Sequence, residues 1–344
     1  MTPTMDALVW MAPRVMQLER VAIPQPAAGE VLIAVGAVGI CGSELSGYLG
    51  QSSIRVPPLV MGHEAAGRVV QAGDTPLADG TTVGVGQRVA FNPLIVCGTC
   101  DCCRRGQSNI CRNRRLIGAH APGAFAAYVA VPAGQCYPLR DGISDVAGSL
   151  TEPLACGVRA VRLAAPAERL LILGAGPIGL CCLVAARAAG IEQITITDIA
   201  EQRLAVARAW GATATINTRE ADLPAATETL APGGFDAVID AVGAAATRTQ
   251  ALQAAVPGGR AVFLGLHDEH TSIHANYLVR QEIAILGSFA YTAADFSRAF
   301  ELISHEAIRA TADWLEERPL AAGPESFEEL LAGRAGATKI VLRV

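Results

Sequence analysis

Four cysteines in one short stretch have the residue type and spacing of a metal site. They are separated by two, two and seven residues. Four thiolates on one loop can surround a tetrahedral zinc ion and leave no position open, which is the pattern of a structural site. Glycine and charged residues fill the rest of the loop, which argues against a set of buried thiols. Cys102 lies off this spacing, and we expect it to be a bystander. The expected ligands are Cys97, Cys100, Cys103 and Cys111.

A second set of zinc-ligand types is dispersed along the chain. Cys41 stands in Gly-Ile-Cys-Gly-Ser, His63 and Glu64 stand in Gly-His-Glu, and Glu152 stands in Thr-Glu-Pro-Leu. Three protein ligands with a vacant fourth position would form a catalytic zinc site. Spacing alone cannot assemble these residues, and single His and Cys residues are often part of a core. From the residues alone, a shared site and separate core positions both remain open.

A glycine-rich turn indicates a nucleotide site. Gly174 permits a tight turn, Gly176 lets the backbone approach a pyrophosphate, and Gly179 allows close packing of helix on strand. The apolar segment before the turn predicts a strand, and the residues after it predict a helix whose first N–H groups can bind phosphate. A glycine turn without a ligand is the alternative. The full motif is Gly174-Ala175-Gly176-Pro177-Ile178-Gly179.

The next predicted strand ends in Asp198, nineteen residues after Gly179. A carboxylate there can accept hydrogen bonds from both hydroxyls of the adenosine ribose. It would repel a 2′-phosphate, so the sequence predicts NAD rather than NADP. Arg203 could flank the adenosine, although a plain surface arginine is nearly as good an interpretation.

The elements that position these residues change character near residue 150. Before it, short strands at 31–35, 67–72 and 87–90 alternate with Gly and Pro turns. After it, strands alternate with helix-length segments, which predicts an α/β fold with a parallel sheet covered on both faces. We expect later strands at 170–173, 193–198, 235–240, 259–264, 282–287 and 339–343, and helices at 178–189, 200–210 and 293–303.

Composition excludes several classes of protein. The 344 residues are 51% hydrophobic and only 17% charged, which does not fit a disordered chain. A net charge of −5 without a basic run predicts no nucleic-acid partner and no anionic membrane surface. Apolar runs are too short for a membrane helix, and residues 1–6 do not look like a secretory signal. We therefore expect a cytoplasmic globular protein.

Taken together, these motifs resemble those of the zinc-containing medium-chain alcohol dehydrogenases, most closely the polyol branch of sorbitol, threonine and butanediol dehydrogenases. The resemblance covers essentially the whole chain. It implies a GroES-like catalytic domain at 1–150, a Rossmann doubly wound parallel sheet at 151–287, and a return to the catalytic domain at 288–344. The residues that carry it are 39–43, 62–64, the four-cysteine loop, 152–154, 174–179 with Asp198, and 287–291.

The resemblance also implies roles for single residues. Cys41, His63 and Glu152 would hold a catalytic zinc ion, with Glu64 as a ligand that exchanges with water or substrate, and Ser43 would begin the proton relay. Two zinc ions per chain are implied, one catalytic and one structural. Further cofactor-lining residues would be Val242, Leu264, Gly265, Leu266, Ser288 and Phe289.

The chain departs from the family pattern around the substrate. Where the family often has Asp, any residue and then His, this chain has Glu44 and Ser46, so the relay histidine is missing. The sorbitol enzymes have Phe-Arg-Tyr where this chain has Phe-Ala-Tyr ending at Tyr291, and their substrate tyrosine is Gly47 here. The expected substrate contacts are Tyr48, Glu152 and Tyr291.

The resemblance implies a zinc-dependent oxidoreductase that transfers a hydride between a secondary alcohol (a polyol, diol or sugar alcohol) and NAD, as a homodimer or homotetramer. Zinc would stabilise the deprotonated alcohol and Ser43 would take its proton. Two alternatives remain. One is an NADPH-dependent quinone or enone reductase of the zinc-free type, which the four-cysteine loop and Asp198 oppose. The other is a catalytically silent binding protein on the same fold.

Overall fold

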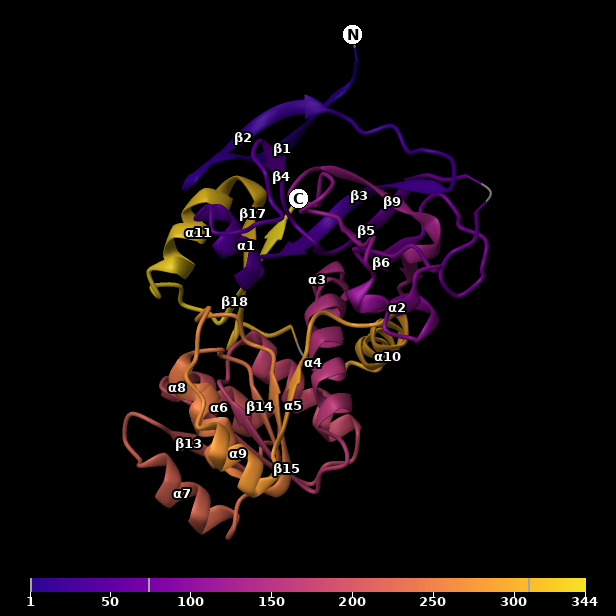
Figure 1. The fold of residues 1–344 in the computed structure, drawn as a ribbon. Coiled ribbons are helices and arrows are strands. Elements are labelled where there is room, and N and C mark those ends of the chain that lie inside the picture. The colour runs from indigo at the N-terminus through magenta and orange to yellow at the C-terminus, as the bar shows by residue number, and fades with distance from the viewer. Residues whose placement is uncertain (1, 74, 309) are drawn as a thin grey trace. The chain divides into compact units, whose positions relative to one another are not determined.

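The structure is a computed structural model that describes residues 2–73, 75–308 and 310–344. The chain divides into two compact units (Figure 1). The first consists of Met1–Glu152 and Phe300–Val344, and the second of Pro153–Ala299. No helix in the described ranges is long and apolar enough to cross a membrane.

Strands make up most of the first unit. They are β1 Thr4–Ala12, β2 Val15–Ala22, β3 Glu30–Gly39, β4 Leu59–Val60, β5 Glu64–Gln71, β6 Arg88–Phe91, β7 Leu94–Ile95, β8 Arg115–Leu116, β9 Tyr128–Pro132, β10 Cys136–Pro138, β17 Leu315–Pro319 and β18 Lys339–Arg343. The largest sheet has the order β10-β6-β5-β3-β18-β17, and β9 pairs with β3 outside this path. Two smaller sheets are formed by β2-β1-β4 and by β7-β8.

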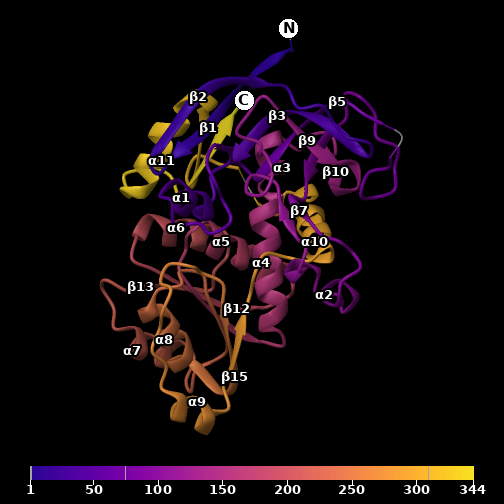
Figure 2. The same ribbon diagram turned by 45° about the horizontal axis from the view of Figure 1, so that its top comes forward.

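The C-terminal segment completes the first unit. Strand β18 lies between β3 and β17, so the last residues of the chain form an inner strand of the large sheet. The helices here are α1 Gly42–Tyr48, α2 Asp101–Arg104, α3 Asp145–Ser149 and α11 Gly323–Leu331. Helix α11 lies beside α1 (Figure 1), and its Phe327 ring packs at 5.2 Å from Tyr48 and 5.9 Å from Phe125. Helix α3 packs on β3 and β5 (Figure 2).

A six-stranded parallel sheet forms the centre of the second unit. Its strands are β11 Arg169–Leu173, β12 Gln193–Asp198, β13 Ala214–Asn217, β14 Phe235–Asp240, β15 Ala255–Phe263 and β16 Ala284–Gly287, in the order β13-β12-β11-β14-β15-β16. The chain thus runs outward from β11 in both directions, which places the topological switch point, where such sheets bind ligands, at the carboxyl ends of β11 and β14. Strands β11 and β12 are almost wholly buried, as expected for a sheet covered on both faces.

Helices surround this sheet. Those within the second unit are α5 Pro177–Ala188, α6 Glu201–Ala209, α7 Leu223–Leu230, α8 Ala245–Gln253 and α9 Ala275–Gln281. Two others, α4 Thr151–Ala164 and α10 Ala293–Ser304, begin or end beyond it. Arg162 of α4 donates hydrogen bonds of 2.8 and 3.0 Å to the buried carboxylate of Asp295 in α10.

The α/β class and the alternating elements expected from the sequence are confirmed. Strands β12, β14 and β18 have the predicted bounds, while β15 begins earlier and β16 is shorter. The second unit runs to Ala299, beyond the sequence boundary at 287, because Tyr291 packs on Phe296 and Asp295 pairs with Arg162 within it. Among the elements that were not predicted are strands β1, β2, β13 and β17 and helices α4, α7, α8, α9 and α11.

Candidate metal centres and nucleotide site

The four spaced cysteines lie together in one loop. Cys97, Cys100, Cys103 and Cys111 have sulfur atoms within 4.8 Å of one another, and the Cys97–Cys111 distance is 3.4 Å. The Cys97 thiol accepts the backbone N–H of Cys100, and backbone N–H groups lower its pKa to about 5. Four thiols so close would repel one another as thiolates without a cation among them. The donor set therefore fits a zinc ion.

Cys102 lies outside the four-sulfur group, as expected. It is buried, and the Arg105 guanidinium lies 3.7 Å from its sulfur. It offers an internal control for the metal site.

The dispersed ligand set is partly assembled in the first unit. Cys41 follows β3, and His63 and Glu64 stand at the start of β5. Because β3 and β5 are paired with Gly39 opposite Glu64, the three residues meet at the end of this strand pair. Their ligand atoms all lie within 4.8 Å of one another. Sulfur, imidazole nitrogen and carboxylate oxygen are the donors that zinc accepts in catalytic sites, so the residues present fit the metal.

Glu152 does not belong to this group among the described residues. It lies in the first turn of α4 and is 7% exposed. Its role as a ligand stays a prediction, and of the two expected carboxylate ligands Glu64 is the one grouped with Cys41 and His63.

Glu44 is a part of the site that the sequence analysis treated only as a departure from the family pattern. Its side chain is fully buried, and Oε1 lies 2.8 Å from His63 Nδ1. The same carboxylate accepts the backbone N–H groups of Gly62 and Cys41 at 2.7 and 3.0 Å. Burial raises the pKa of Glu44, but the neighbouring His63 and Arg55 outweigh it and lower the pKa overall. Glu44 therefore orients His63 with its other ring nitrogen, Nε2, available to a metal.

Lys339 is a second residue that the sequence analysis missed. Its ammonium group is buried, hydrogen-bonds the carboxylate of Glu64, and donates to the Ile40 carbonyl at 2.9 Å. Burial lowers its pKa, but Glu64 and Cys41 outweigh this effect and raise it. The signal in the sequence was that Lys339, the single lysine of the chain, stands at the start of an apolar segment.

Ser43, the expected proton acceptor, contacts the metal-ligand group directly. Its hydroxyl donates to the Cys41 sulfur at 3.4 Å, and Arg55 donates to the same hydroxyl oxygen at 3.3 Å. Ser46, at the position of the family's relay histidine, donates to the Gly42 carbonyl at 3.5 Å.

The two tyrosines expected at the substrate are both buried. The Tyr48 hydroxyl donates to Glu328 and also lies 2.9 Å from the Arg14 carbonyl, and burial together with Glu328 raises its pKa to about 12. Tyr291 is 1% exposed and packs on Phe296. The substrate contacts of both tyrosines stay predictions.

The glycine motif has the geometry of a nucleotide loop. Gly174 has φ +95° directly after β11, and Gly176 precedes Pro177, the first residue of α5. A Cβ on Gly179 would lie 1.8 Å from the Gly174 carbonyl oxygen, so only glycine allows this close approach. Ile178, in the first turn of α5, is half-buried. The first N–H groups of α5 therefore stand where a pyrophosphate can bind.

Asp198 ends β12 beside this loop. Its carboxylate accepts the backbone N–H groups of Ala175 at 2.8 Å and Ala200 at 2.9 Å. Arg203 lies 3.8 Å from the same carboxylate and is partly exposed. The loop and the acidic residue are thus fixed to each other.

The other expected cofactor-lining residues stand at the carboxyl ends of the neighbouring strands. Ser288 is 8% exposed, and its hydroxyl has no hydrogen-bond partner among the described residues. An unsatisfied buried hydroxyl is costly, which fits a group completed by a cofactor. Val242, Leu266 and Phe289 are 38%, 81% and 45% exposed, unusual for apolar side chains. Leu264 and Gly265 follow β15 directly, and all six lie at the sheet edge that carries the glycine loop.

The four-cysteine loop makes a direct prediction. Replacing Cys103 with Ser removes one thiolate, so bound zinc should fall by about one ion per chain and the thermal midpoint by about 5 °C. Cys102→Ser is the matched control and should keep the wild-type zinc content. Elemental analysis and thermal unfolding measure both, and equal zinc in the two variants would contradict the assignment.

The bond from Glu44 to His63 makes a second prediction. Glu44→Gln keeps the size of the side chain but removes its charge, and metal affinity at the Cys41 group should fall by about 10- to 100-fold. Glu44→Asp should retain more affinity than Glu44→Gln. Competition with a zinc chelator measures the affinity, and an unchanged value in Glu44→Gln would show that the carboxylate does not orient His63.

Comparison with known proteins places these sites in a family. Residues 27–141 match the profile of the alcohol dehydrogenase GroES-like domain, and residues 177–305 match that of the zinc-binding dehydrogenases. The chain is 38% identical over 270 residues to an L-threonine 3-dehydrogenase of Pyrococcus abyssi, covering 76% of each chain. It is 33% identical to an L-idonate 5-dehydrogenase of Vitis vinifera, covering 81% of this chain and 78% of the relative.

A solved structure agrees over the full length. The chain is similar to a protein from Sinorhizobium meliloti described as a zinc-binding dehydrogenase bound to NADP, with a TM-score of 0.89, 31% identity and complete coverage of both chains. The fold, the two cysteine-containing groups and these relatives leave the zinc-free reductase and the silent binding protein without support. The chain belongs to the zinc-containing medium-chain alcohol dehydrogenases, in the branch of threonine and polyol dehydrogenases, and is an oxidoreductase.

Proposed function

We propose that this enzyme reversibly oxidises a secondary alcohol, a polyol or diol, to a ketone with NAD⁺. The observation that carries the proposal is the buried group of Cys41, His63 and Glu64, with Ser43 in contact with it. The same chain contains a parallel sheet with a glycine loop and an acidic residue at its carboxyl edge. A metal-ligand group and a dinucleotide fold together are what hydride transfer from an alcohol requires.

Each residue of the site then has a task. Cys41 and His63, with Glu64 or Glu152, would hold a zinc ion, which when bound lowers the pKa of an alcohol hydroxyl as it lowers that of water. Ser43 accepts the alcohol proton. Glu44 keeps His63 in the ligating orientation, and Lys339 balances the buried charge of Glu64. The proton leaves through Ser46, water or the hydroxyls of the cofactor, because the relay histidine is absent.

The cofactor we propose is NAD, bound across the glycine loop and the strand-end residues. A bound nicotinamide supplies the hydride acceptor. Asp198 carries a negative charge at the ribose end, and a 2′-phosphate placed near it would be repelled. Because a solved relative is bound to NADP, the preference of this enzyme for NAD over NADP needs to be measured.

The preference depends on the charge of Asp198. Asp198→Ala should lower kcat/KM with NAD⁺ by about tenfold or more and raise the ratio of NADP⁺ to NAD⁺ activity. Arg208→Ala, which removes an exposed charge in α6, is the control. Steady-state kinetics with both cofactors decide the matter, and an unchanged ratio in Asp198→Ala would refute the proposed contact.

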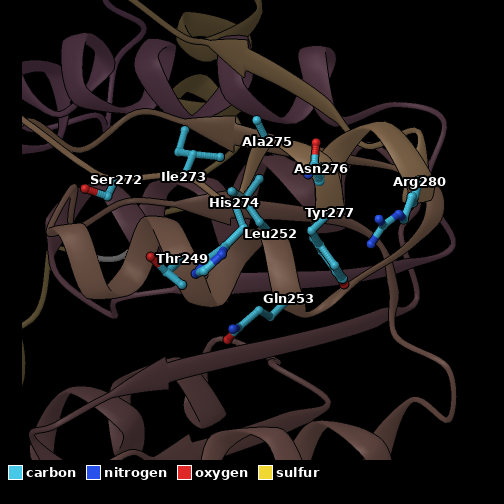
Figure 3. A pocket seen from close by; sticks show the side chains of 10 residues that line it. All are labelled: Thr249, Leu252, Gln253, Ser272, Ile273, His274, Ala275, Asn276, Tyr277 and Arg280. Carbon is cyan, nitrogen blue, oxygen red and sulfur yellow. The ribbon is translucent and has the colours of Figure 1, made fainter.

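We further propose a homodimer or homotetramer built on strand β16. This strand is the exposed edge of the parallel sheet, and Ile285 on it is 37% exposed. Ile273, Tyr277 and Val279, in and just before helix α9, are also exposed, and a cavity of about 500 Å³ lies between α8 and α9 (Figure 3). An unpaired apolar edge is a liability that a second copy would cover. A monomeric mass in light scattering would refute this assembly.

We also propose a cytoplasmic location. The reducing conditions there keep the thiols of the metal sites reduced, and cell fractionation checks the location.

The central proposal is tested with Cys41→Ser. A serine hydroxyl is not a thiolate at neutral pH, so bound zinc should fall by about one ion per chain. The value of kcat/KM should fall by about 1,000-fold, or ~4 kcal/mol of transition-state stabilisation. The assay is NAD⁺ reduction over sugar alcohols, vicinal diols, amino alcohols and their phosphates. NADH binding should be unchanged, and full turnover with two zinc ions would overturn the proposal.

A further inference from the structure

Strand β14 carries an aspartate near each end, and the two carboxylates differ in their surroundings. Asp236, near the amino end, is partly exposed and accepts the backbone N–H groups of Glu168 and Arg169 at 3.0 and 2.8 Å. Its other oxygen accepts a hydrogen bond from the Arg169 guanidinium, so both oxygens have partners. Asp240, at the carboxyl end, is fully buried, and its Oδ2 has no hydrogen-bond partner among the described residues.

The burial of Asp240 is unfavourable for folding. Burial raises the pKa of its carboxyl group, and the N–H groups of Gly243 and Val242 and the charge of Arg248 offset this effect only in part. A buried carboxylate with one oxygen unpaired lowers the stability of the fold, whereas Asp236 is fully paired. Residues that cost stability in this way are typical of functional sites.

The other oxygen of Asp240 holds the turn that follows β14. Oδ1 accepts the backbone N–H groups of Val242 and Gly243 at 3.0 and 2.9 Å. A Cβ on Gly174 would lie 2.6 Å from the Val242 side chain, so this turn packs directly on the glycine loop. The carboxylate therefore fixes the turn beside the loop that receives the pyrophosphate.

The main chain of Asp240 holds the segment that follows β15. Its carbonyl accepts the N–H groups of Leu264 and Gly265 at 3.0 and 2.9 Å. A Cβ on Gly265 would lie 2.1 Å from the Val242 carbonyl carbon, and a Cβ on Gly243 would lie 2.1 Å from that of Gly265. The two segments are thus in backbone contact, and a shift of one displaces the other.

Arg248 in α8 fixes the segment after β15 farther along. Its guanidinium donates to the carbonyls of Gly265 and Asp268 at 3.4 and 2.8 Å and to the Thr271 hydroxyl at 2.9 Å. Asp240 holds the start of this segment, and Arg248 holds the residues that follow. The turn after β14 has no such second anchor on its backbone N–H groups, so its conformation depends on the Asp240 carboxylate.

The two segments belong to one half of the nucleotide site. Strands β11, β12 and β13 form one mononucleotide-binding half of such a sheet, and β14, β15 and β16 form the other. Asp198 at the end of β12 places the adenosine on the first half in the proposed binding mode. The segments that Asp240 holds, 242–243 and 264–265, then line the nicotinamide half.

We propose that Asp240 is a positioning residue for the nicotinamide half of the cofactor, because its carboxylate fixes the turn at 242–243 and, through it, the segment at 264–266. This inference rests on the proposed function. Asp240 acts through the backbone that it holds and not by touching the cofactor. Its loss should therefore weaken binding of the nicotinamide half and leave binding of the adenosine half unchanged.

The experiment compares NADH with AMP, which carries only the adenosine half, on the zinc-loaded enzyme by isothermal titration calorimetry. Asp240→Ala removes the acceptor of both N–H groups, so the Kd of NADH should rise by about tenfold or more. The Kd of AMP should change by less than about twofold. Asp240→Asn keeps an acceptor oxygen of the same reach and should hold the Kd of NADH within about threefold of the wild type.

Asp236→Ala is the matched control. Asp236 lies on the same strand and also accepts two backbone N–H groups, but at the opposite end. This variant should lower the thermal midpoint by about 5 °C and leave the ratio of NADH to AMP affinity at the wild-type value. Because loss of stability alone does not change the ratio, the ratio separates positioning of the turn from a purely structural role.

Three results for the variants overturn the inference. A wild-type ratio in Asp240→Ala shows that the carboxylate serves only the fold, and equal losses of NADH and AMP affinity show that it maintains the whole sheet edge. Losses in Asp240→Asn as large as those in Asp240→Ala show that the charge, and not the held turn, is what matters. If Asp240→Ala does not fold, Asp240→Ser decides, because its shorter side chain reaches at most one N–H group and should change the ratio by about threefold.

Failure of the proposed function looks different. A wild-type enzyme that binds neither NADH nor NADPH refutes the proposed cofactor site, and the inference fails with it. Every result in which the wild type binds NADH leaves the proposed dehydrogenase intact and tests Asp240 alone.

Discussion

A fully buried carboxylate holds the metal-ligand group together. Glu44 accepts hydrogen bonds from Cys41, Gly62 and His63, and so ties the segment after β3 to the segment before β5. A buried carboxylate whose partners moved away would be left charged and unsatisfied at a cost of several kcal/mol. The same bonds that stabilise Glu44 therefore keep the two ligands in place. The position of Ser43, one residue before Glu44 in α1, follows from them.

Charge balance explains why the site draws on distant parts of the chain. The group formed by Cys41, Glu44 and Glu64 concentrates acidic side chains at one buried point, and cations must offset them. One is Lys339 from β18, close to the C-terminus, and another is Arg55 from the segment before β4. The C-terminal segment, by entering the large sheet, thus supplies both a charge to the site and apolar side chains to the core. Removing that segment would leave Glu64 without its ammonium partner.

In the second unit, which carries the nucleotide site, backbone geometry rather than charge balance positions the site. Its parallel strands end at one edge, so the glycine loop, Asp198 and the segments after β14, β15 and β16 meet there. Close approach of helix to strand at Gly179 and the hydrogen bond from the Ala175 N–H to Asp198 hold the loop against the strand ends. A ligand at this edge would contact exposed apolar side chains such as Phe289 and would hydrogen-bond the unsatisfied hydroxyl of Ser288.

The sequence by itself determined what is local: the four-cysteine loop, the glycine motif with Asp198, and the alternation of strands and helices. Ligands close in sequence, or a strand-turn-helix unit, need no tertiary contact to be recognised. Only the tertiary structure showed that Glu64 lies with Cys41 and His63 in one group, that Glu44 orients the imidazole, and that Lys339 and Arg55 bring positive charge. It also buried Tyr48 and Tyr291, which the sequence had placed at the substrate. These features depend on strand register and on segments up to 299 residues apart, which no spacing pattern along the chain encodes.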